Sequence, residues 1–184
     1  MSTVADRSIS IRKALPEEFS RLGQMTVAVY ADLPGMPSVA EQPEYYSMLL
    51  DVAKRDSNPA ISIFAALSAA GELLGSVDFI DDMKQYGSGG AACNLSEAAG
   101  IRLLAVRPEF RGMGLGKALT TFCIEQARQR AKFKVVLHTT RAMETAWTMY
   151  ERMGFQRYPE IDFQQGHLDV FGFKLDLTAA LTAK

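Results

Sequence analysis

The chain has 184 residues, of which 48% are hydrophobic and 22% are charged, and its formal net charge is −1. This length and composition suit one globular domain over residues 1–184 with room for a sizeable core. A net charge near zero provides no general attraction to nucleic acid or to an anionic membrane, so neither is an expected partner. No segment approaches the ~18 apolar residues of a membrane span, and residues 1–10 lack an apolar signal-peptide core. We therefore expect a cytoplasmic protein.

Cysteine and histidine are scarce in this chain. Cys93 and Cys123 are too few for a disulfide framework, and His138 and His167 do not make a plausible zinc ligand set. Free thiols and no metal site are expected.

Strand and helix patterns alternate in the first half of the chain. Alternating apolar residues predict a strand over 9–15, and Pro16 begins a helical apolar stripe that continues to Tyr30. Further predicted elements are a loop over 31–40, a helix over 44–55, and a hairpin of two strands over 61–67 and 73–80.

The second half continues the alternation after a polar segment. Residues 81–97 contain several glycines and are expected to form a mobile loop. The elements predicted after it are a strand over 100–106, a helix over 114–130, a strand over 133–139, a helix over 142–153 and a strand over 169–177. The order β-α-α-β-β-β-α-β-α-β-β indicates an α/β protein.

A glycine-rich turn, Arg111-Gly112-Met113-Gly114-Leu115-Gly116, lies between an apolar run and a helical pattern. Glycine lets backbone N–H groups approach a ligand closely, and the first turn of a helix offers unpaired donors and the positive end of its dipole. Arg111 and Lys117 add two positive charges. The turn is therefore predicted to bind an anionic group such as a phosphate.

Two common nucleotide-binding loops do not fit this turn. A Walker loop would need glycine in place of Arg111 and Ser or Thr in place of Ala118. A dinucleotide fingerprint starting at Gly112 would need glycine in place of Lys117. The pattern that does match is [Q/R]-x-x-G-x-[G/A], through Arg111, Gly114 and Gly116.

A second motif follows downstream and completes a family resemblance. Residues 146–155 read AWTMYERMGF, which is similar to the A-x-x-L-Y-E-K-x-G-F helix of the GNAT N-acetyltransferases. The two motifs occur in the order and spacing of that family. The chain thus resembles GNAT enzymes clearly over residues 73–155 and, as a pattern only, over 9–30.

The resemblance implies a GNAT-like α+β fold, a twisted mixed sheet with helices on both faces, and acetyl-CoA as cosubstrate. The pyrophosphate would lie on the glycine-rich turn, and the pantetheine arm would pair with strand backbone facing residues 135–137. Met143 stands where many members carry asparagine, which leaves one cofactor contact without its usual residue. The cofactor-binding residues implied are Leu104, Ala105, Val106, Arg111, Gly112, Met113, Gly114, Leu115, Gly116 and Lys117.

The resemblance also implies direct attack of an amine on the thioester, with Tyr150 as the acid that protonates the departing thiolate. A general base is needed because an alkyl ammonium is almost fully protonated near neutral pH. Glu97, before the cofactor strand, and Asp78, in the preceding strand, are the candidates, although solvated or edge carboxylates would look the same in sequence.

The acceptor pocket is expected to come from residues 31–46, 81–97 and 158–168. Acidic residues in these segments hint at a cationic acceptor, and tyrosines offer aromatic walls: Asp81, Asp82, Glu160 and Asp162, with Tyr30, Tyr45 and Tyr46. The acceptor is left open between a small amine, a peptide terminus and a protein lysine. A homodimer is common in the family. The alternative function is a non-catalytic acyl-CoA-binding sensor or regulatory module.

Overall fold

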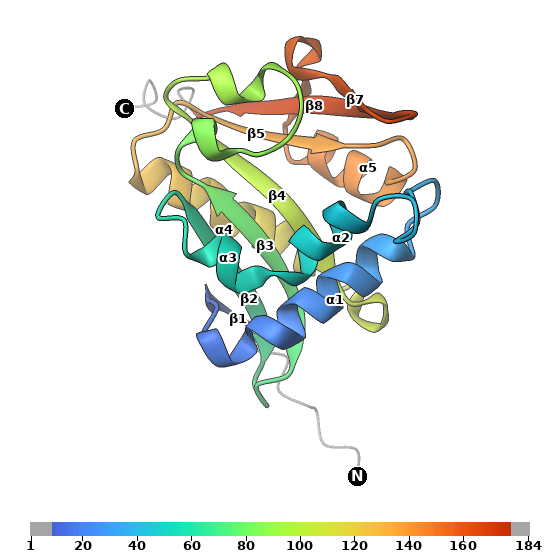
Figure 1. The fold of residues 1–184 in the computed structure, drawn as a ribbon. Helices are drawn as coiled ribbons and strands as arrows, with labels where there is room; N and C mark the ends of the chain where they lie inside the picture. The colour runs from blue at the N-terminus through green and yellow to red at the C-terminus, as the bar shows by residue number, and fades with distance from the viewer. Residues whose placement is uncertain (1–8, 178–184) are drawn as a thin grey trace.

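An eight-stranded mixed sheet organises the computed structural model, which describes residues 9–177 (Figure 1). The strand order is β1-β2-β3-β4-β5-β8-β6, with β7 paired to β8. All pairs are antiparallel except β4 with β5. The strands are β1 (Ile9–Lys13), β2 (Ile61–Ser68), β3 (Leu73–Ile80), β4 (Ala98–Val106), β5 (Lys134–Thr139), β6 (Gln156–Arg157), β7 (Phe163–Gln165) and β8 (Leu168–Asp176).

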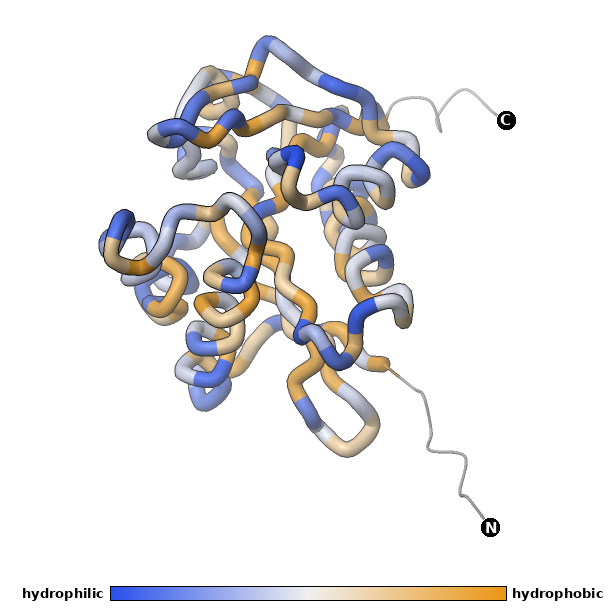
Figure 2. The backbone as a smooth tube through the Cα atoms, turned by 90° about the vertical axis from the view of Figure 1, so that its right-hand side faces the viewer, coloured by the Kyte–Doolittle hydropathy of each residue, from blue (hydrophilic) through white to orange (hydrophobic). Residues whose placement is uncertain are grey.

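Helices cover both faces of the sheet, as the resemblance implies. One face packs against α1 (Phe19–Ala31), α2 (Pro43–Leu50) and α3 (Val52–Asp56), and the other against α4 (Leu115–Gln129) and α5 (Glu144–Arg152). Strand β2 shows why: Ile63 and Ala65 join the core under α1, whereas Phe64 and Ala66 join the core under α4. Figure 2 shows hydrophobic residues concentrated along the inner strands and hydrophilic residues in the outer loops.

The parallel strands β4 and β5 separate partway along their length. They pair only from Ala98 opposite Lys134 to Ile101 opposite Leu137. Beyond Ile101, β4 continues to Val106 without a β5 partner. The resemblance implied that residues 104–106 face residues 135–137, but this is wrong, because residues 98–101 pair with 134–137 and residues 104–106 lie past the paired section.

A β-bulge on β4 lies where the two strands separate. Ser76 of β3 faces Ala105 and Asp78 faces Arg102, so Val77 stands opposite two residues of β4. Leu103, one of those two, has a φ of 52°. A bulge of this kind bends the strand and increases its twist, which directs the end of β4 away from β5.

Most predicted elements are confirmed within a few residues, and the helix predicted over 44–55 is the main exception. It is interrupted at Asp51, which ends α2 and whose side chain accepts a hydrogen bond from the N–H of Lys54 in α3. The guanidinium of Arg55 binds the carbonyls of Met48 and Leu49 at the end of α2. These hydrogen bonds supply partners for the backbone groups that the break leaves unpaired. The apolar periodicity of the sequence does not reveal such a break.

The segment 81–97, predicted to be a mobile loop, contains short helical turns and buried side chains. It forms 3₁₀ turns at Met83–Gln85 and Ala91–Asn94, and Met83, Tyr86 and Ala92 are buried. Further 3₁₀ turns lie at Pro16–Glu18, Pro108–Phe110 and Pro159–Ile161. Three strands rather than two follow α5, since β6 and β7 are too short to show a pattern.

In the described part of the chain, no helix combines the length and apolar character needed to cross a membrane.

Candidate active site

The glycine-rich turn forms an exposed cradle, residues 111–117, between β4 and α4. Gly112 and Gly114 have φ values of 76° and 80°, and a Cβ at either position would meet no atom within 4 Å. Gly114 is the N-cap of α4 and provides no side-chain acceptor, so the first-turn N–H groups lack a cap. The backbone donors and the exposed charges of Arg111 and Lys117 therefore fit the phosphate-binding role predicted for this turn.

The separation of β4 from β5 leaves a strand edge beside the cradle. Residues 104–106, predicted to bind the cofactor, lie on the part of β4 that no β5 residue pairs with. Thr139 and Thr140, where β5 ends, are 2% and 4% exposed, and their hydroxyls find no hydrogen-bond partner in the described structure. Buried hydroxyls without partners are uncommon in proteins, so these two are available to bind a polar group in the opening.

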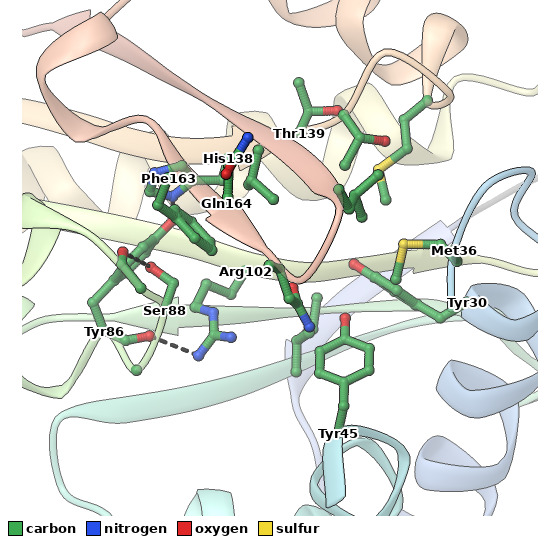
Figure 3. A pocket seen from close by; sticks show the side chains of 18 of the residues that line it. Tyr30, Met36, Tyr45, Tyr86, Ser88, Arg102, His138, Thr139, Phe163 and Gln164 are labelled. Carbon is green, nitrogen blue, oxygen red and sulfur yellow. Dashed lines mark hydrogen bonds between the residues drawn. The ribbon is translucent and has the colours of Figure 1, made fainter. Parts of the chain in front are cut away.

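A cavity of about 340 Å³ reaches this opening from the α1 and α2 side of the sheet (Figure 3). Its wall comes from α1, α2, residues 86–89, β4, the end of β5, β7 and β8. Tyr30 and Tyr45 line it, as predicted, and the Tyr30 hydroxyl donates to the carbonyl of Leu104 at 3.4 Å. Tyr46 instead packs in the core under α1 and donates to the carbonyl of Pro37.

Tyr86 and His138 form a hydrogen-bonded pair in the cavity wall. The distance from the Tyr86 hydroxyl to His138 Nδ1 is 2.9 Å, and from His138 Nε2 to the carbonyl of Ile161 it is 2.7 Å. A carbonyl only accepts, so Nε2 carries the proton and Nδ1 accepts from Tyr86. Burial lowers the pKa of His138, which favours this neutral form. In the sequence, His138 stands out only as a residue near the end of the strand predicted over 133–139.

Tyr150 lies on α5 in the core under α4, against Phe155. Its side chain is buried, and burial raises its pKa, with smaller contributions from Tyr86 and Cys123. Tyr150 does not line the cavity, which lies on the opposite side of the sheet. The pKa of Tyr30 in the cavity wall is raised mainly by burial, then by Tyr45 and then by Tyr150, so Tyr150 acts electrostatically on a residue of that wall. The raised pKa of Tyr150 keeps its phenol protonated at neutral pH and makes it a weaker acid than a free tyrosine.

The two carboxylates predicted as bases lie elsewhere. Glu97 is exposed, outside the cavity, and seven residues before Leu104, or roughly 20 Å along an extended strand. Asp78 is buried on β3 and pairs with Arg55, with 2.8 Å between Oδ2 and Nε. Burial raises the pKa of Asp78, and Arg55 opposes that shift. The geometry gives Asp78 a structural partner and supports neither residue as the base.

The acidic residues that hinted at a cationic acceptor do not line the cavity either. Asp81 pairs with Lys132 at 3.1 Å, Asp162 pairs with Arg157 at 2.6 Å, and Asp82 accepts from the N–H of Lys84. Glu160 is exposed. Arg102, which sequence reasoning did not single out, is the one ionised side chain among the described residues of the cavity wall. The only sign in the sequence that Arg102 has a special role is that it is a charged residue within an otherwise apolar strand.

Comparison with known proteins places this geometry in a family. The model of the acetyltransferase (GNAT) family matches residues 26–155, which is more than half of the chain. The chain therefore belongs to the GNAT acetyltransferase family, as its two motifs predicted.

Individual relatives are similar over shorter segments. The chain is 40% identical over 58 residues to mycothiol acetyltransferase of Arthrobacter sp. (strain FB24), which covers 32% of this chain and 18% of that protein. It is 36% identical over 61 residues to N-alpha-acetyltransferase 30 of Schizosaccharomyces pombe, covering 33% of this chain and 41% of that protein. The aligned segments thus span less than half the length of either relative.

A solved structure supports the fold over nearly the whole chain. The PaiA N-acetyltransferase of Thermoplasma acidophilum, solved in complex with coenzyme A, superposes with a TM-score of 0.68 at 19% identity. The match covers 91% of this chain and 99% of that one. At this identity the likeness concerns the fold.

Proposed function

We propose that this protein is an N-acetyltransferase that moves the acetyl group of acetyl-CoA directly to an amine. The observation that carries the proposal is the opening between β4 and β5, because its β4 edge runs on in sequence to the cradle and residues at its other end line the cavity. A sensor that only bound acyl-CoA would need the cradle and the opening but not a cavity beyond them.

The residues present fit acetyl-CoA, which supplies an activated acetyl thioester. Residues 111–117 would hold the pyrophosphate through backbone N–H groups and two cations. The free edge of residues 104–106 would pair with the pantetheine amides as an added strand does. The hydroxyls of Thr139 and Thr140 would gain the partners that they lack. A backbone N–H near Ala105 or Val106 would polarise the thioester carbonyl as charge develops on its oxygen.

Proton movement is assigned to two places in this site. Tyr150, kept protonated by burial, donates its proton to the sulfur in concert with cleavage of the C–S bond, because transfer to an already formed thiolate would be uphill. The amine loses its proton to the Tyr86 hydroxyl oxygen as Tyr86 passes its own proton to Nδ1 of His138. His138 then carries two N–H groups, with Nε2 still donating to Ile161. This pair replaces Glu97 and Asp78 as the proposed route to a base.

The test is amine-dependent release of CoA, with the acetylated product identified by mass spectrometry. We expect turnover on a panel of small amines, and Tyr150→Phe should lower kcat about tenfold or more because the thiolate loses its acid. Acetyl-CoA affinity should stay within about threefold, since the phenol hydroxyl does not bind the cradle. Tyr158→Phe, which removes the same hydroxyl group from a tyrosine outside the cavity wall and the cradle, is the matched control.

Two results would count against this proposal. Saturable acetyl-CoA binding with no acetylated product from any amine would favour the sensor. Unchanged kcat in Tyr150→Phe would remove Tyr150 from the mechanism while leaving the transferase reaction intact.

A further inference from the structure

The charge of the cavity wall is unusual for a site that binds amines. Its lining residues include tyrosines, methionines, glutamines and aliphatic side chains, but no aspartate or glutamate. The single ionised group is the guanidinium of Arg102, since His138 is held neutral. An acceptor with two or more ammonium groups would find no counter-charge in this wall and would meet a fixed cation.

Arg102 is held in place by the segment that carries Tyr86. Its Nη1 donates to the carbonyl of Tyr86 at 2.6 Å, and its guanidinium lies 5.5 Å from the centre of the Tyr86 ring (Figure 3). Gly87 has a φ of 68°, and a Cβ there would lie 2.9 Å from the same Nη1. The bare glycine backbone therefore leaves the space that the guanidinium occupies.

Most of the hydrogen-bonding capacity of Arg102 is unused. A guanidinium has five N–H donors, and the contact to Tyr86 is the one hydrogen bond that it makes within residues 9–177. No carboxylate of the described residues lies within ion-pair distance of it. Asp78 stands opposite Arg102 in the β3–β4 register, but its Oδ2 is bound by Arg55.

The free donors are not positioned for the phosphates of the cofactor. Arg102 is four residues before Val106, the last residue of β4, and this separation is roughly 13 Å along the strand. The cradle begins five residues after Val106. Arg111 and Lys117 already serve the cradle. A planar guanidinium with paired free donors is suited to bind a carboxylate through two hydrogen bonds.

We propose that the acceptor is a small amine that carries a carboxylate, and that Arg102 binds this carboxylate while the amine faces the opening between β4 and β5. The inference rests on the proposed function and adds the class of acceptor. Tyr30, Tyr45 and Phe163 give the rest of the wall an aromatic character, which favours an apolar side group on the acceptor. This assignment replaces the cationic acceptor that the loop composition suggested.

The experiment compares matched pairs of acceptors that differ only in the carboxylate. Each α-, β- or γ-amino acid or aminobenzoate is paired with its decarboxylated amine, for example L-phenylalanine with phenethylamine. For at least one pair, we expect kcat/KM to favour the carboxylate by about 10- to 100-fold or more, the range of a charge-assisted contact. Arg102→Gln should reduce this ratio to within about threefold of one. Arg128→Gln, an exposed arginine on α4, is the matched control and should keep the ratio.

A binding measurement accompanies the kinetics. Calorimetric titration of the CoA-free protein with the N-acetylated product of the preferred pair should show saturable binding that Arg102→Gln weakens by a similar factor. Far-UV circular dichroism and the Tm establish that the variant is folded. Arg102→Lys should recover part of the preference, because it restores the charge but not the paired donors.

Several outcomes would overturn the proposal. One is that decarboxylated amines or spermidine are acetylated better than every carboxylate partner. Another is that the preference for the carboxylate survives in folded Arg102→Gln. These results would leave the transferase function standing. Absence of any acetylated product, with or without a carboxylate, would instead contradict the proposed function itself.

Discussion

At the scale of single residues, the site depends on which groups are charged and which are neutral. The role proposed for Tyr150 comes from the sequence, because Tyr150 belongs to a contiguous motif of the family. Arg102 and the Tyr86–His138 pair could not be predicted, because Arg102 is held by Tyr86, 16 residues away in the chain, and Tyr86 and His138 are 52 residues apart. Neither predicted carboxylate lines the cavity, and nothing in the local sequence shows that Asp78 is paired with Arg55, 23 residues earlier.

The His138 assignment predicts a specific pH dependence. The ordinary histidine pKa is ~6.5, and burial lowers the pKa of His138 below it. The neutral form therefore persists at neutral pH, and kcat/KM should fall only as the pH drops below about 6.5 towards the lowered pKa. The free energy of unfolding should fall over the same window, because the unfolded chain binds the proton more readily.

His138→Gln checks this assignment. The acid limb of the kcat/KM profile should disappear, and the rate at neutral pH should drop about tenfold or more. Replacing His167, which lies in the β7–β8 turn, by glutamine should leave the limb unchanged. An unaltered acid limb in His138→Gln would show that His138 is not the proton acceptor.

At the scale of elements, patterns of apolar residues predicted the strands and helices well. A strand buries every second side chain and a helix buries a stripe with a period of about 3.6 residues, so the two leave different patterns in the sequence. They could not predict the break at Asp51 or the packing of residues 81–97, since both depend on contacts with distant segments. The cradle was predictable because its chemistry is contained in one turn.

The cradle allows a matched comparison of two glycines. Gly114 and Gly71 have similar φ values, 80° and 77°, and open space where a Cβ would lie. Gly114→Ala and Gly71→Ala should each cost about 1 kcal/mol in the free energy of unfolding, measured by denaturant titration, because alanine is strained there. Only Gly114→Ala should also weaken acetyl-CoA binding, by about tenfold, since it disturbs the N–H groups of the cradle. Equal loss of affinity in both variants would contradict the assignment of the cradle.

At the scale of the whole molecule, the fold assembles the two parts of the proposed site, the cradle and the cavity, from segments that lie far apart in the sequence. The bulge at Leu103 and the end of the β4–β5 pairing open the sheet in its middle. Segments from α1, α2, residues 86–89, β7 and β8 then form a cavity on one side. The family resemblance implied the opening, but the chemistry of the cavity depends on the least patterned parts of the chain. The homodimer and the single-domain assignment stay predictions.

The most direct test of the account is calorimetric titration of the purified protein with acetyl-CoA, beside Arg111→Ala and the control Arg128→Ala. We expect saturable binding at micromolar ligand, weakened about tenfold in Arg111→Ala by loss of a charge-assisted phosphate contact. Arg128→Ala should bind as the unaltered protein does. No binding at millimolar acetyl-CoA, or equal affinity in Arg111→Ala, would contradict the claim that residues 111–117 hold the cofactor.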